Sequence, residues 1–162
     1  MKLPQTGGCL CGAVRYGVSL LPMATYTCHC TACQRLSGSA FSSAIVVAAE
    51  AFRPSGGETR PFYRTTDSGR TSTRWVCAEC GVWICGGPKP GMAEPGTFVF
   101  VRAGTLDDTS WLRPTVHFWT RSAQPWVTLP DGDVRFETQP ADYLAWLRSM
   151  ADHQRQSDHQ PG

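Results

Sequence analysis

Long apolar runs are absent from this chain of 162 residues. No stretch approaches the roughly 20 apolar residues that a membrane-spanning helix needs. The opening residues, MKLPQTGG, lack the apolar core of a secretory signal peptide. We therefore expect a cytoplasmic protein that has no membrane as a partner.

Charge is also scarce, with charged residues at 17% and a formal net charge of +2. Because this excess is small and the Arg and Lys residues are scattered, we expect no nucleic-acid partner. Hydrophobic residues make up 41%, which excludes a disordered chain and a coiled coil. The length suits one hydrophobic core, so we expect a single zinc-binding domain over residues 1–152 and a flexible polar tail over residues 153–162.

Short segments of apolar and β-branched residues, separated by Gly, Pro, Ser or Asp, predict a mainly β protein, either a sandwich or a folded sheet. The predicted strands are residues 13–18, 23–27, 40–48, 59–64, 71–76, 82–85, 97–101, 115–120 and 134–137. A short helix is predicted over residues 31–37, ended by Gly38. A C-terminal helix is predicted over residues 141–151, where Tyr143, Leu144 and Leu147 recur at helical spacing.

The chain has eight cysteines, and seven of them fall into three clusters. The clusters are Cys9-Leu-Cys11-Gly, Cys28-His-Cys30-Thr-Ala-Cys33 and Cys77-Ala-Glu-Cys80-Gly. A disulfide framework is possible on the count alone, but cysteines separated by one residue are poorly placed to bridge one another. In a cytoplasmic protein clustered cysteines more often bind metal, and a closed tetrahedral zinc site needs two such pairs.

The middle cluster differs because it offers three sulfur atoms within six residues. Cys28 and Cys30 share one face of an extended segment, and the following turn brings back Cys33. Three local ligands leave one tetrahedral position free, as in reactive zinc sites, unless a fourth cysteine closes this site as well. Cys85 is the spare cysteine, although its apolar surroundings favour a buried core thiol. His29 lies between two ligands, so we expect its side chain to point away from the metal and either to lie at the surface or to support the site.

Together these clusters resemble the family of glutathione-dependent formaldehyde-activating enzymes, which also includes centromere-protein-V-like domains. The resemblance rests on three stretches: GCLCGAVRY at residues 8–16, CHCTACQR at residues 28–35 with SGSAF at residues 37–41, and RWVCAECG at residues 74–81. Further matches, in family order, are GTLDD from Gly104, then Pro114, His117 and Trp126. The resemblance covers most of the chain.

The resemblance implies an Mss4-like fold of folded β-sheets with zinc knuckles and two Zn²⁺ per chain. It assigns Cys9, Cys11, Cys77 and Cys80 to a structural zinc, and the catalytic zinc to Cys28, Cys30 and Cys33. The reaction implied joins formaldehyde and glutathione reversibly to S-(hydroxymethyl)glutathione, which is a carbon–sulfur lyase chemistry. The partner would be glutathione, another small thiol, or its aldehyde adduct.

Gln34, Arg35 and Ser37, beside the middle cluster, are candidates to bind the glutathione, and Arg35 could pair with a carboxylate. His117 is either a general acid/base or a hydrogen-bonding strand residue, and we favour the second role. The alternative to an enzyme is a non-catalytic zinc-stabilised module that binds a protein or a thiol ligand. A redox sensor that releases zinc on oxidation is a third hypothesis. The oligomeric state does not follow from the sequence.

Overall fold

The computed structural model of the chain describes residues 1–66 and 69–157, with only the backbone for residues 151–157. Residue contacts divide the chain into two compact units, each made of two segments. The first unit contains Met1–Pro22 and Ala44–Leu112, and the second contains Met23–Ser43 and the residues from Arg113 onward. Each unit carries one set of clustered cysteines, so the two candidate sites can be described separately.

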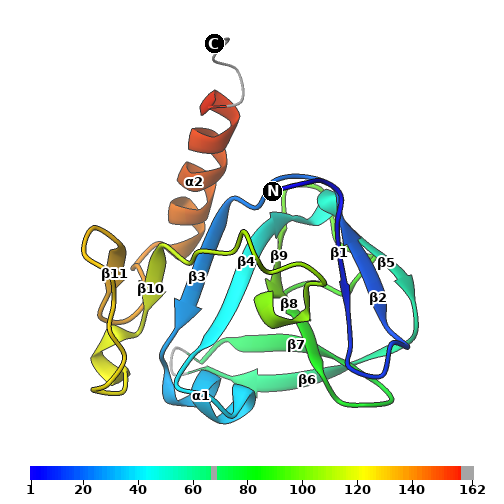
Figure 1. Cartoon of the computed structure of the whole chain (residues 1–162), viewed down its shortest axis with the longest axis horizontal. Coiled ribbons are helices and arrows are strands. Elements are labelled where there is room, and N and C mark those ends of the chain that lie inside the picture. Colours follow the sequence, from blue (N-terminus) through cyan, green and yellow to red (C-terminus); the bar gives the residue numbers. More distant parts are fainter. Residues whose placement is uncertain (67–68, 158–162) are drawn as a thin grey trace. The chain divides into compact units, whose positions relative to one another are not determined.

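The first unit consists of two antiparallel sheets (Figure 1). A three-stranded sheet has the order β1 (Gln5–Gly8), β2 (Arg15–Val18) and β5 (Phe52–Gly56). A second antiparallel ladder has the order β4 (Ser42–Ala48), β9 (Phe98–Arg102), β8 (Trp83–Gly86), β7 (Thr71–Cys77) and β6 (Thr59–Thr65). Residues 44–48 of β4 belong to this unit.

The core of the first unit is made of β-branched residues on neighbouring strands. Ile45 pairs with Val101, and Val47 with Val99, between β4 and β9, and all four side chains are fully buried. Such side chains pack well on a pleated sheet and are stiff, so their burial costs little entropy. This core fixes the sheets from which the first cysteine cluster projects.

The second unit has three short parallel strands, in the order β11 (Val134–Phe136), β10 (Val116–Phe118) and β3 (Ala24–Cys28). Its helices are α1 (Thr31–Ser37) and α2 (Tyr143–Ser157). Phe118 of β10 packs edge-on against Tyr26, Tyr143 and Trp146 and stacks on Phe136. Because parallel strands need a long crossover, β10 and β11 are joined by an extended loop of residues 119–133.

The predicted fold class is confirmed: the protein is mainly β with two helices. Each predicted strand overlaps an observed one, and α1 has the predicted bounds, ending at Gly38 with φ of 60°. Helix α2 begins at Tyr143 and continues to Ser157, beyond the predicted end at Ala151. The predicted tail is therefore helical over residues 153–157, and residues 158–162 lie outside the described part of the chain. The single domain and the Mss4-like fold stay predictions.

Two strands were missed in the sequence, both in the three-stranded sheet. Strand β1 reads QTGG and has no apolar side chain, while β5 reads FRPSG and buries only its first residue. Neither has the alternation of apolar and polar residues that indicates a strand. They form because β2, which buries Tyr16 and Val18, offers a backbone edge on each side.

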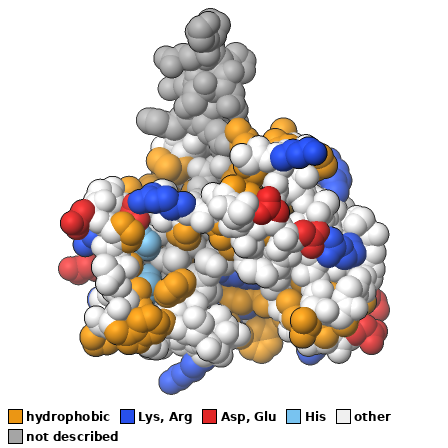
Figure 2. Space-filling model, in the orientation of Figure 1, with side chains coloured by type: hydrophobic (Ala, Val, Ile, Leu, Met, Phe, Trp, Pro, Cys, Tyr) orange, Lys and Arg blue, Asp and Glu red, His pale blue; other side chains and the backbone are white. Residues whose placement is uncertain are grey.

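The surface carries charges of both signs. Basic and acidic side chains are interspersed over the face drawn in Figure 2, with small groups of hydrophobic side chains between them. Within the described residues, neither helix has the length and apolar character to cross a membrane.

Gly57, just after β5, packs against the turn that carries the first cysteine pair. Its φ is 67°, a left-handed conformation that favours glycine, and a Cβ at this position would overlap the carbonyl group of Ala13. Gly96 is a matched control within the same unit, because its φ is 79° but a Cβ there would meet nothing within 4 Å.

We predict that Gly57→Ala destabilises the protein more than Gly96→Ala does. Gly96→Ala adds only the backbone strain, about 1–2 kcal/mol. Gly57→Ala adds a steric overlap worth about 1–3 kcal/mol more. Urea unfolding of both variants in zinc-containing buffer measures the difference. Equal losses of unfolding free energy would mean that the contact with Ala13 is not tight.

Candidate metal centres

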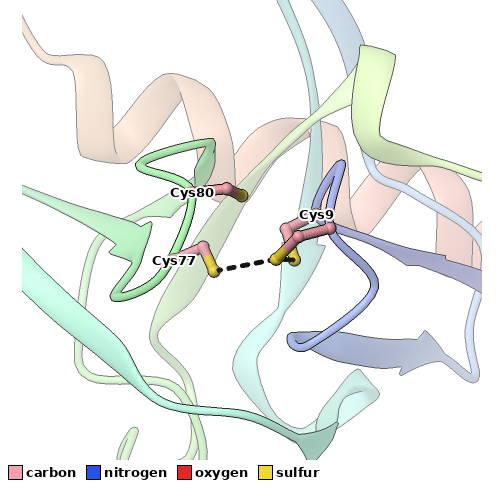
Figure 3. Close-up of side chains that lie close together, drawn as sticks. Cys9, Cys77 and Cys80 are labelled. Atoms are coloured by element: carbon pink, nitrogen blue, oxygen red, sulfur yellow. Dashed lines mark hydrogen bonds between the residues drawn. The ribbon is translucent and has the colours of Figure 1, made fainter.

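Four cysteines from two distant segments meet in the first unit. Cys9 and Cys11 lie in the turn between β1 and β2, while Cys77 ends β7 and Cys80 lies in the turn that follows. All four Sγ atoms lie within 4.8 Å of one another, with Cys9–Cys11 at 3.3 Å and Cys11–Cys77 at 3.9 Å. Figure 3 shows the side chains of Cys9, Cys77 and Cys80 lying close together. A tetrahedral zinc with Zn–S near 2.3 Å needs sulfurs about 3.8 Å apart. The four residues fit a closed metal site.

Two glycine turns direct these sulfur atoms. Gly12 N–H donates to the carbonyl of Cys9 at 3.1 Å, and Gly81 N–H donates to that of Cys77 at 3.0 Å. Their φ angles are 80° and 74°, a conformation that residues with a Cβ adopt only with strain. Each turn folds the chain back within four residues, which places both sulfurs of a pair on one side.

Backbone hydrogen bonds favour the thiolate form of Cys9 and Cys80. The N–H of Val14 donates to the Sγ of Cys9 at 3.2 Å. Backbone N–H groups of Val82 and then Cys11 lower the pKa of the Cys80 thiol to about 6. A thiolate is the form that binds metal, so Cys80 is already prepared for a cation at neutral pH.

The second unit brings together Cys28, Cys30 and Cys33, with all three Sγ atoms within 4.8 Å of one another. Cys28 is the last residue of β3, and Cys30 is the N-cap residue of α1. The Sγ of Cys30 accepts a hydrogen bond from the N–H of Cys33 at 3.3 Å, as a capping side chain does. Among the described residues, no fourth Cys, His, Asp or Glu joins this cluster.

Crowding of the three thiols makes the second cluster a candidate cation site. The sulfur atoms of Cys30 and Cys33, followed by burial, raise the pKa of the Cys28 thiol well above its usual value. Three thiolates this close repel one another, and a divalent cation would remove that repulsion. This cluster can therefore hold a metal through three protein ligands and leave a further position for another molecule.

The seven predicted ligands thus fall into the two groups expected, and either group could hold a metal ion. Cys85 belongs to neither group: it lies in β8 with no exposed surface, as predicted for a core thiol, and burial raises its pKa to about 12. His29 is fully buried, so of the two roles left open for it, the surface role is wrong.

Three residues next to Cys33 were predicted to bind a ligand, and the structure gives two of them internal partners. The side-chain amide of Gln34 donates to the carbonyls of His29 at 2.7 Å and Ser122 at 2.8 Å. The hydroxyl of Ser37 lies 2.9 Å from the carbonyl of Cys33, which it can bond at the end of α1. Arg35 is exposed on α1. Ligand binding by these residues stays a prediction.

A buried chain of hydrogen bonds lies behind the three cysteines. Asp133 Oδ2 contacts His117 Nε2 at 3.1 Å, and His117 Nδ1 contacts the hydroxyl of Thr27 at 2.7 Å. The same hydroxyl lies 2.9 Å from His29 Nε2. Each of the four side chains is at least nine-tenths buried. His117 is therefore a hydrogen-bonding strand residue, which is the role that we favoured.

When both imidazoles are neutral, the carboxylate of Asp133 sets the direction of these hydrogen bonds. A hydrogen bond from His117, aided by Arg113, lowers the pKa of Asp133, so this carboxylate only accepts and His117 Nε2 carries a proton. With neutral imidazoles, the Thr27 hydroxyl donates to His117 Nδ1 and accepts from His29 Nε2. Burial lowers the pKa of His29, which keeps it neutral. His29 Nδ1 is then a bare acceptor, and it has no partner among the described residues.

Thr27 and Asp133 were missed as supporting residues. Thr27 lies next to Cys28 but looks like an ordinary strand residue, and Asp133 lies more than one hundred positions further along the chain. The one signal available was the Asp131-Gly-Asp133 turn beside a predicted strand, which resembles many surface turns.

We predict that Thr27→Val lowers the unfolding free energy by about 1–3 kcal/mol, because it leaves His117 and His29 each with a buried, unpaired nitrogen. Thr25→Val on the same strand is the matched control, since its hydroxyl bonds the Arg113 carbonyl at an exposed position. We expect a change within about 0.5 kcal/mol for the control. Urea unfolding compares the two. Similar effects would show that the buried chain contributes nothing to stability.

The sequence of the chain matches a known protein family. No curated protein matches the chain. The profile of the glutathione-dependent formaldehyde-activating enzymes matches residues 4–122, which include all seven clustered cysteines. Since the match spans well over half of the chain, the protein belongs to the glutathione-dependent formaldehyde-activating enzyme family.

Proposed function

We propose that the protein is a zinc-dependent enzyme of the carbon–sulfur lyase type, which acts on adducts of glutathione or another thiol with a small aldehyde. Its activity would resemble that of S-(hydroxymethyl)glutathione synthase. Two Zn²⁺ would bind per chain, one at Cys9, Cys11, Cys77 and Cys80 and one at Cys28, Cys30 and Cys33. Family membership supports the substrate class, and the two cysteine groups support the metal.

The incomplete ligand set of the second cluster is the observation that carries this proposal. Three sulfur ligands converge, and no fourth Cys, His, Asp or Glu of the described chain joins them. Structural zinc sites are closed by four protein ligands, whereas reactive sites keep a position for water or substrate. Cys28 and Cys30 are also partly exposed, so a small thiol can approach them.

The reaction balances without an oxidant or a reductant. In the forward direction the sulfur of the thiol supplies the electron pair for a new S–C bond to the aldehyde carbon. The electron pair of the C=O bond moves to oxygen, which takes up the proton that the thiol loses. The reverse direction breaks the same S–C bond and releases aldehyde and thiol.

The chain's own residues would orient the substrate and hold the cysteine ligands in place, and they would not carry the proton. When bound, zinc supplies Lewis acidity that lowers the pKa of a coordinated thiol. Arg35, exposed on α1, would pair with a carboxylate of glutathione, while Gln34 and Ser37 hold α1 and its carbonyl groups in place. The buried Asp133–His117–Thr27–His29 chain would keep the end of β3 rigid, so that Cys28 and Cys30 hold their spacing.

Thiol binding to the cobalt-substituted protein tests the proposal. Co²⁺ replaces zinc in cysteine sites and reports an added thiolate through its visible and charge-transfer bands. We expect glutathione to change the bands of the Cys28/Cys30/Cys33 site and to leave those of the other site unchanged. Cys30→Ser is the control, since it removes one ligand of the responding site. Bands that do not respond to any thiol would exclude the lyase and favour a non-catalytic zinc-stabilised binding module.

Removing one ligand from each site should have different consequences. Cys77→Ser should unfold or aggregate the protein, because binding of a structural zinc is coupled to folding. Cys30→Ser should remain folded and lose about one zinc of the two. Elemental analysis together with circular dichroism measures both effects. Identical behaviour of the two variants would refute the division into a structural and a reactive site.

A further inference from the structure

Trp126 lies in the crossover loop between β10 and β11, and 70% of its surface is exposed. Its indole N–H donates a hydrogen bond of 2.7 Å to the side-chain oxygen of Gln124. The polar end of the indole is thus held by the protein, while its apolar ring faces solvent. Tryptophan in this arrangement is typical of binding surfaces, where the ring contacts a partner and the N–H is satisfied.

Two glutamine side chains link this indole to the three-cysteine cluster. The amide nitrogen of Gln124 donates to the side-chain oxygen of Gln34 at 3.2 Å. Gln34 follows Cys33, and its own amide nitrogen donates to the carbonyl of His29, the residue between Cys28 and Cys30. The chain of hydrogen bonds runs from the backbone of the cluster to the indole without leaving the second unit.

Both polar atoms of the Gln34 side chain form hydrogen bonds within the protein. Its nitrogen also donates to the carbonyl of Ser122, in the same crossover loop, at 2.8 Å. The loop is therefore tied at two points to the segment that carries the cysteines, and Trp126 has a defined place beside that segment. Because the exposed ring already has a fixed orientation, it loses little further conformational freedom when a ligand contacts it.

We propose that Trp126 is a substrate-contacting residue that makes the site selective for peptide thiols over small thiols. This inference rests on the proposed function, because it assumes that a thiol binds at Cys28, Cys30 and Cys33. The sulfur of such a ligand would occupy the cluster, and a planar amide of its peptide part would lie on the indole ring. A small thiol such as 2-mercaptoethanol has no such group and would gain nothing from the ring.

The test compares glutathione with 2-mercaptoethanol on cobalt-substituted Trp126→Ala. We expect the Kd of glutathione to rise about threefold to tenfold, because an aromatic contact of this kind is lost. The Kd of 2-mercaptoethanol should stay within about twofold of the wild-type value. Trp126→Phe keeps a ring and should retain most of the affinity for glutathione.

Leu144→Ala provides the surface control, since Leu144 is a large apolar residue of α2 with 52% of its surface exposed. It should change neither Kd. An unchanged affinity of Trp126→Ala for glutathione, or an equal loss for both thiols, would overturn the selectivity role while the thiol site stands. Failure of the wild-type protein to bind either thiol would instead overturn the proposed function, and the role of Trp126 with it.

Discussion

Repulsion between thiolates is the constraint on which the first unit depends. Four sulfur atoms lie within 4.8 Å of one another, and they come from segments as far apart as Cys11 and Cys77, which are 66 positions distant. Ionised sulfurs at this spacing repel strongly unless a cation lies between them. A metal bound by the four cysteines would replace this repulsion with a cross-link between the β1–β2 turn and the β7–β8 turn. It would thereby join the three-stranded sheet to the longer ladder of this unit.

The second cluster is local, and this changes what a metal would do there. Cys28, Cys30 and Cys33 lie within six positions, so a metal bound to them closes only a short loop. Their geometry is set by the protein instead: β3 pairs with β10, Cys30 caps α1, and the buried Asp133–His117–Thr27–His29 chain holds the strand end. A site preformed in this way can leave a coordination position for a ligand without losing its shape.

Local patterns predicted most of the fold and both cysteine groups, because cysteine spacing, glycine turns and strand alternation are local properties. Helix α1 ends at Gly38, as its sequence indicates. What the sequence did not reveal are partners that meet only through the fold. Asp133 and Thr27 are unremarkable in their own segments. They meet only in the fold, where each contacts one ring nitrogen of His117 in β10. Similarly, β1 has no pattern of its own and forms against β2.

Charge decides which contacts can select a substrate at the proposed thiol site. Three thiolates and one Zn²⁺ carry a net charge of about −1, so an added thiolate brings the complex to about −2. Coordination alone therefore provides limited affinity, and it is the same for every thiol of similar basicity. Selectivity has to come from contacts beyond the sulfur atom, with groups that the protein holds in fixed positions. In the second unit, the exposed Arg35 offers charge, and the tethered ring of Trp126 offers an apolar face. A substrate with both a carboxylate and a planar amide would use the two together, so a peptide thiol would bind the proposed site more tightly than a simple thiol would.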